Sequence, residues 1–186
     1  KCGCREPVRN KHDEAKLMFK SYSLSMLAIL CFALFETAIL SNITVLPAVP
    51  DMVLIASIYI SLLNGRGMGE ITGFSSGLIL DFLSASPFGF NCIFRTLISY
   101  IAGFFGGSIN FKGFFIPFMA GLFGTLSKAV FIWLLSLFYT SVIRYDILSI
   151  PFLFELVSNA FLSPLVFKLM DAFSGKLSVN KEDIDR

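Results

Sequence analysis

The sequence predicts an all-α integral membrane protein with six membrane-spanning helices and both termini in the cytoplasm. Of the 186 residues, 55% are hydrophobic and 15% are charged, and the mean hydropathy is +0.77. The charged residues cluster at the two ends of the chain. A soluble domain of this size could not cover so many Phe, Leu and Ile side chains with so few polar ones. We therefore expect a single membrane domain.

The charge pattern divides the chain into a polar tail over residues 1–21, a membrane domain over 22–173 and a second charged tail over 174–186. Both tails are expected in the cytoplasm. The pair Cys2 and Cys4 lies in the first tail without a second cysteine pair beside it, so a solvated tail is a better interpretation than a metal site. The role of this tail is left open.

Six apolar segments follow one another between short polar turns. They cover residues 22–43, 51–63, 68–84, a stretch beginning near Phe90, 114–142 and 147–173. Pro50 precedes the second span, and Pro87 with Gly89 ends the third, because proline cannot continue a helix and glycine permits a tight reversal. Pro164 should kink the last span. The second span is short for a hydrocarbon core of about 30 Å.

A stripe of small residues runs along the third span. Gly69, Gly73 and Gly77 recur every four residues and lead to Asp81, so all four share one slowly drifting face of a helix. In lipid, small residues at this spacing let two helices approach closely. We expect this face to pack tightly against another helix.

The basic residues support six spans with this orientation. Of the fifteen Lys and Arg residues, twelve fall on the proposed cytoplasmic side. They are Lys1, Arg5, Arg9, Lys11, Lys16, Lys20, Arg66, Lys112, Lys168, Lys176, Lys181 and Arg186. The proposed outer loops contain only Arg144. Such an asymmetry is the positive-inside signal of membrane proteins.

The membrane segments lack the residues that most enzymes use. The chain has one histidine, His12, and it lies in the polar tail. Phosphate-binding loops, dinucleotide fingerprints and acidic pairs able to bind a metal diphosphate are not found either. We expect no catalysis, no cofactor and no metal, and nothing in the charge pattern predicts binding to nucleic acid.

Five ionisable residues fall within the spans: Glu36, Asp81, Arg95, Lys128 and Glu155. Charges in lipid are expensive, so they usually face the interior of the helix bundle and find partners there. Asp81 and Arg95 are expected at similar depth in one hairpin, which predicts an ion pair. Lys128 is expected to pair with Glu155 or Glu36, and Asn159 could form a hydrogen bond between helices.

These groups have three alternative interpretations. In the first, the pairs serve only to fix the register of the helices. Glu36, Asp81, Arg95 and Glu155 could instead wall a polar cavity that opens outwards and receives a ligand or a partner segment. Transport of protons or ions is the third alternative, and it would need a carboxylate exposed alternately to both sides.

Several motifs together resemble the MreD family of rod shape-determining membrane proteins. They are Pro50-Asp51, the series Gly73-x-x-x-Gly77-Leu78-x-x-Asp81, Pro87-x-Gly89, and Glu155-Leu156-x-x-Asn159 with Ser163-Pro164 after it. The likeness extends from about Leu24 to Phe173. It implies a multi-pass protein of the bacterial inner membrane that binds MreC without being an enzyme. Through that complex it would act with MreB, with RodA and with RodA's transpeptidase partner in peptidoglycan synthesis.

The resemblance also implies roles for particular residues. The stripe Gly69, Gly73 and Gly77 becomes a candidate for packing within the bundle. The candidates for the polar cluster, or for binding a partner, are Glu36, Asp51, Asp81, Arg95, Lys128, Glu155 and Asn159.

An alternative function is that of a vitamin-binding membrane subunit of an energy-coupling-factor transporter. Those subunits also have six spans, and MreD proteins resemble them in fold. They typically carry an Ala-x-x-x-Ala motif in the first span, whereas Ala28, Ala33 and Ala38 are spaced by five residues here. This difference makes the transporter the less favoured alternative.

Overall fold

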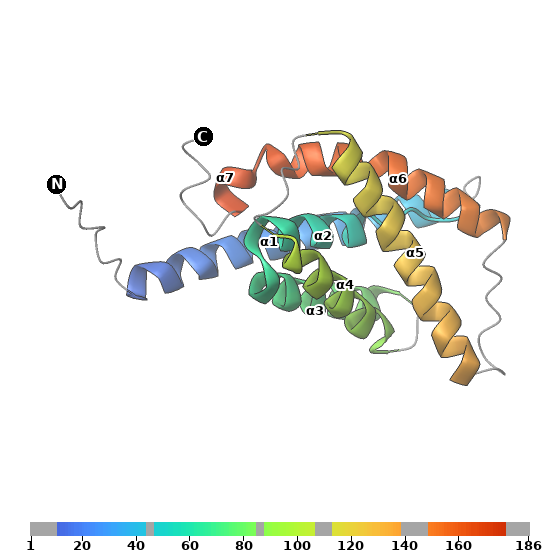
Figure 1. Ribbon diagram of the computed structural model, residues 1–186, viewed down its shortest axis with the longest axis horizontal. Helices are drawn as coiled ribbons and strands as arrows, with labels where there is room; N and C mark the ends of the chain where they lie inside the picture. Colours follow the sequence, from blue (N-terminus) through green and yellow to red (C-terminus); the bar gives the residue numbers. More distant parts are fainter. Residues whose placement is uncertain (1–10, 44–46, 85–87, 107–112, 139–148, 178–186) are drawn as a thin grey trace.

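The computed structural model describes residues 11–43, 47–84, 88–106, 113–138 and 149–177, and within these ranges all regular secondary structure is helical (Figure 1). The helices are α1 (Lys11–Ala38), a short 3-10 helix η1 (Leu40–Asn42), α2 (Met52–Asn64), α3 (Arg66–Leu83), α4 (Phe90–Phe104), α5 (Phe115–Phe138), α6 (Ile150–Asp171) and α7 (Ser174–Leu177). Each predicted apolar segment overlaps one helix, from α1 to α6, over its described residues. Helix α1 begins at Lys11, inside the segment that we expected to be a polar tail.

Three stretches are long and apolar enough to cross a membrane, namely Met18–Asn42, Phe115–Ser136 and Ile150–Asp171. Helices α2 and α4 are apolar but shorter. The 13 residues of α2 extend over about 20 Å, less than the hydrocarbon thickness of about 30 Å. Pro164 lies inside α6, which continues past it to Asp171. Pro87 lies outside the described residues.

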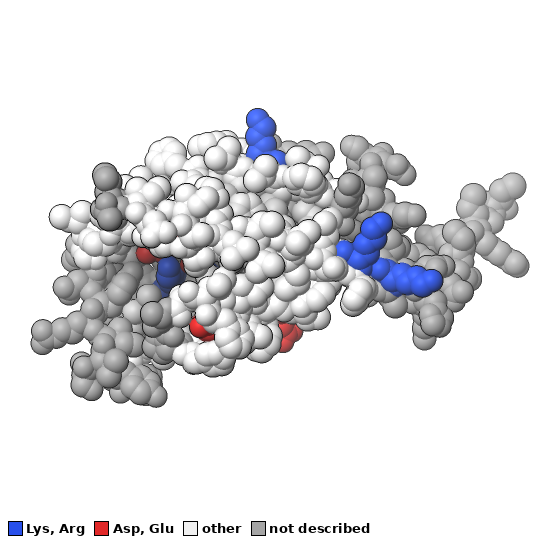
Figure 2. Space-filling view, turned by 180° about the vertical axis from the view of Figure 1, so that it is seen from behind, with Lys and Arg blue, Asp and Glu red and all other residues white. Residues whose placement is uncertain are grey.

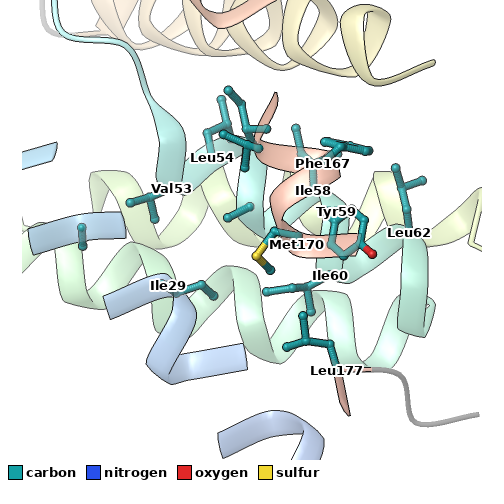
Figure 3. Packing of buried hydrophobic residues seen from close by; sticks show 14 of the residues in the cluster. Ile29, Val53, Leu54, Ile58, Tyr59, Ile60, Leu62, Phe167, Met170 and Leu177 are labelled. Atoms are coloured by element: carbon teal, nitrogen blue, oxygen red, sulfur yellow. The ribbon is translucent and has the colours of Figure 1, made fainter. Parts of the chain in front are cut away.

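Helix α2 is the centre of the fold. Every residue from Val53 to Leu62 is buried, because α2 contacts α1, α3, α4, α5 and α6. Figure 3 shows side chains of α2 packed with Ile29 of α1, with Phe167 and Met170 of α6, and with Leu177 of α7. A helix that is hydrophobic on all sides must be surrounded in this way or face lipid.

Two tight connections place α3 beside its neighbours. Gly65 alone separates α2 from α3, and its φ of +80° is a conformation that glycine adopts without strain. Gly89 has a φ of +91° and precedes α4. Helices α3 and α4 therefore form a close antiparallel pair after α2.

The glycine stripe of α3 lies directly against α4. A Cβ atom added to Gly73 would lie 2.6 Å from the carbonyl oxygen of Arg95, and one added to Gly77 would lie 2.5 Å from that of Asn91. At Gly69 the nearest atom would be the carbonyl oxygen of Ser99, at 2.8 Å. The nearest atom at each of the three positions belongs to the backbone of α4, so rotating a neighbouring side chain would not make room for the added Cβ atom.

The C-terminal turn α7 closes the bundle at the end where α1 begins (Figure 1). The carbonyl oxygen of Leu177 accepts hydrogen bonds from Ser21 Oγ of α1 and from Asn64 Nδ2 of α2. Leu177 itself is buried in the core. The last described turn thus ties the first two helices to the sixth.

We predict that Gly77→Ala destabilises the protein by about 1 to 3 kcal/mol, the usual effect of overpacking a tight interior. The matched control is Gly67→Ala on the same helix, where an added Cβ would meet nothing within 4 Å. Melting temperatures in one detergent should fall for the first variant and stay level or rise for the second. Equal melting temperatures for the two variants would contradict the packing described here.

Candidate functional site

Asp51 is the centre of a buried cluster of charged side chains. It is 3% exposed and caps the N-terminus of α2, where its Oδ1 accepts a hydrogen bond of 2.8 Å from the backbone amide of Leu54. Arg95 Nη2 of α4 lies 2.5 Å from the same Oδ1. Lys128 Nζ of α5 lies 3.4 Å from Oδ2. One carboxylate therefore joins three helices.

Two further side chains extend the cluster into α6. Lys128 Nζ donates to Glu155 Oε1 at 2.6 Å, so of its two expected partners Lys128 contacts Glu155. Asn159 Oδ1 accepts from the backbone amide of Asp51 at 2.8 Å, and its Nδ2 donates to Thr125 Oγ1 at 2.9 Å. Helices α2, α5 and α6 are thereby fixed in register.

Glu36 of α1 lies at the edge of this cluster. Its Oε2 accepts a hydrogen bond of 3.4 Å from the backbone amide of Val53, and its side chain is half-buried. Within the described residues, the ion pairs below 4.0 Å join Arg95 and Lys128 to Asp51 and Glu155, and none includes Glu36. The cluster thus has three carboxylates for two cations.

Arg95 has unused hydrogen-bonding capacity inside the protein. It is 1% exposed, and within the described part of the chain neither its Nε nor its Nη1 has a hydrogen-bond partner. Its attraction to Asp51 must therefore offset most of the free energy that its burial costs. The cluster depends strongly on that one contact.

The prediction that Arg95 forms an ion pair with Asp81 is wrong, because Arg95 pairs with Asp51. Asp81 instead accepts hydrogen bonds at the start of α4, from the backbone amides of Gly89 (2.9 Å), Asn91 (3.1 Å) and Cys92 (3.2 Å), and from Asn91 Nδ2 (2.9 Å). The first amides of a helix have no partner within it, and a carboxylate also suits the positive end of the helix dipole. Asp81 therefore caps the start of α4, and Arg95 forms its ion pair with Asp51 instead.

The expected wall of Glu36, Asp81, Arg95 and Glu155 therefore does not form as one group, because Asp81 lies apart from the other three. Two grooves on the described part of the surface are lined by other residues, one between α1 and α6 and one along α1 beside Ile79 of α3. Figure 2 shows a face whose middle is free of charge, with charged atoms at a few places around it and acidic and basic atoms adjoining at one of them. Within the described residues, no group of His, Cys, Asp or Glu is arranged to hold a metal ion.

Sequence reasoning recognised the members of the cluster but missed the central position of Asp51. The available signal was its place directly after Pro50 and before an apolar run, which is the pattern of a helix N-cap. Thr125 was also missed. It lies three residues before Lys128 and so on the same face of α5, but a single threonine in an apolar helix carries little information.

These observations define a helical membrane protein whose intramembrane charges are bound mainly to one another. The sequence matches the family described as rod shape-determining protein MreD over residues 18–173. The chain belongs to this family, so the predicted resemblance is confirmed and the protein has a role in determining rod shape. Comparisons with curated proteins and with solved structures find no match.

We predict that Arg95→Met is strongly destabilising, by about 3 kcal/mol, because it removes one partner of a buried ion pair. The control Glu70→Gln changes an exposed residue of α3 and should leave the melting temperature unchanged. The double variant Asp51→Asn with Arg95→Met should be more stable than Arg95→Met alone, since no carboxylate is then left without its closest cation. A double variant less stable than the single one would argue against the pair.

Asp81→Ala should loosen the start of α4 without disturbing Asp51. Loss of an N-cap costs about 1 to 2 kcal/mol, so exposure of Cys92 by local opening should rise about tenfold. The measurement is the rate of maleimide labelling of Cys92, which is 6% exposed, with the exposed Cys31 as an internal reference. An unchanged ratio of the two labelling rates would show that the cap is unimportant.

Proposed function

We propose that this protein is a non-enzymatic scaffold subunit of the bacterial cell-elongation complex, which binds MreC and thereby supports peptidoglycan synthesis and cell-shape control. Through the complex it would also be connected to MreB filaments, RodA and the transpeptidase partner of RodA. Membership of the MreD family, over residues 18–173, is the observation that carries this proposal.

The geometry of the charge cluster supports a scaffold. Asp51, Arg95, Lys128 and Glu155 contact one another, and Asp81 binds backbone amides of α4. Groups held in this way fix the positions of the helices relative to one another. A rigid bundle is what a protein needs if it is to present a constant surface to other membrane proteins.

We further propose that the helices form six spans of the inner membrane with both termini in the cytoplasm. Lys16 and Lys20 lie early in α1, Arg66 begins α3, and Lys168 lies in the last turn of α6. These helix ends lie towards the same end of the bundle in Figure 1, as the positive-inside rule requires for an even number of spans. The fold of energy-coupling-factor substrate subunits remains the expected likeness.

The proposal predicts that MreC and other members of the elongation complex co-purify with the tagged protein when native membranes are extracted in a mild detergent. Mass spectrometry would identify both proteins and small molecules in the eluate. Arg95→Met should lower the recovery of MreC along with the melting temperature, whereas Glu70→Gln should change neither. Recovery of an ATPase-containing transport module or of a bound vitamin would favour the transporter alternative and contradict the scaffold.

A further inference from the structure

An apolar groove of about 460 Å³ runs between α1 and α6. Its α1 wall includes Ala28, Cys31, Phe32 and Phe35, and its α6 wall includes residues from Leu162 to Met170, a length of about 12 Å. Met52, at the start of α2, also lines it. Small side chains such as those of Ala28 and Cys31 allow another helix to approach closely in lipid.

Glu36 is the residue that follows Phe35, the last residue of α1 that lines this groove. It follows Phe32 by one turn of α1, and its carboxylate accepts a hydrogen bond from Val53, the residue after the groove residue Met52. It is also the carboxylate of the cluster that has no cation within 4.0 Å in the described part of the chain. The groove therefore joins an apolar surface to a carboxyl group that has no ion-pair partner among the described residues.

We infer that this groove receives a membrane-spanning helix of a partner protein that carries a Lys or Arg at the level of Glu36. The three carboxylates of the cluster, Glu36, Asp51 and Glu155, share two cations, Arg95 and Lys128. The partner's basic residue would supply a third cation. Apolar residues of the same helix would cover Phe35 and Leu165, which are 42% and 66% exposed. The inference rests on the proposed scaffold function and assigns it a binding surface.

A lipid fits the groove less well than a helix does. Glu36 lies two residues before the end of α1 and six residues before Asn42, where the apolar stretch Met18–Asn42 ends. A lipid amine would have to leave the headgroup region and enter the hydrocarbon to reach it. A long basic side chain on a neighbouring helix can pair with Glu36 at that depth.

The test uses the full chain in its native bacterial membrane, with the photoreactive residue benzoylphenylalanine at Leu165 in the groove. The matched control places it at Ile93 of α4, which is similarly exposed (58%) but lies outside the groove. After irradiation, mass spectrometry should find position 165 crosslinked to a membrane-spanning peptide that contains Lys or Arg. Crosslinks from position 165 to lipid only, or the same peptide from position 93, would overturn the inference.

Glu36→Gln tests the role of the charge. It should lower the yield of the crosslink from position 165 by about threefold to tenfold, in the range of polar contacts between membrane helices. Changing the partner's basic residue to Gln should have the same effect, and the double change should add little. An unchanged yield in Glu36→Gln, or fully additive effects, would show that Glu36 does not bind the partner.

The two proposals can fail separately. If MreC co-purifies with the wild-type chain but position 165 crosslinks only to lipid, the scaffold stands and the groove is not its surface. If position 165 captures a basic helix of another protein and MreC does not co-purify, the groove is a binding surface and the proposed partner is wrong.

Discussion

The hydrocarbon interior of a membrane offers no water to a charged side chain, so buried charges need partners within the protein. Asp51 is the residue that provides such a partner for both Arg95 and Lys128. One carboxylate caps α2 and binds Arg95 and Lys128, while the backbone amide of the same residue binds Asn159. Asp51 thus connects four of the helices, α2, α4, α5 and α6. Because α2 is too short to span the bilayer by itself, its polar start must lie among other helices, and the cluster satisfies that requirement.

Close backbone packing provides the second element of the design. Helix α2 is enclosed on all sides, and the glycines of α3 bring α4 close enough for Arg95 to reach Asp51. Lipid supplies no hydrophobic force between helices, so dense contacts and interhelical hydrogen bonds must hold them together. The glycine stripe and the charge cluster are therefore two parts of one arrangement, in which the stripe sets the distance and the cluster sets the register.

Local signals in the sequence predicted the helices well. Apolar runs, Pro50 and Gly89 placed α2, α3 and the start of α4 to within a few residues, because turns and spans depend on neighbouring residues. The start of α1 was missed, since a polar helix continuing from a span into the tail has no apolar pattern. Of the charge pairs, Lys128 with Glu155 was among the predicted ones, but Arg95 was given the wrong partner. Both Asp81 and Asp51 are carboxylates within reach of Arg95 as far as the sequence shows. Only the three-dimensional course of the backbone shows that Asp81 binds the amides at the start of α4 and that Asp51 binds Arg95.

The order of the charged residues along the chain has a consequence for biogenesis. Asp51 and Arg95 lie in the first four helices, whereas Lys128 and Glu155 lie in the last two. Each segment thus carries a pair of opposite charges that can neutralise one another before the rest of the protein emerges from the ribosome. The α5–α6 hairpin can insert as an electrically balanced unit, and docking it onto α2 then only adds the contacts of Lys128 and Asn159 to Asp51. In this order each of the two segments brings one ion pair of its own into the lipid, Asp51 with Arg95 and Lys128 with Glu155, whereas Glu36 of the first segment belongs to neither pair.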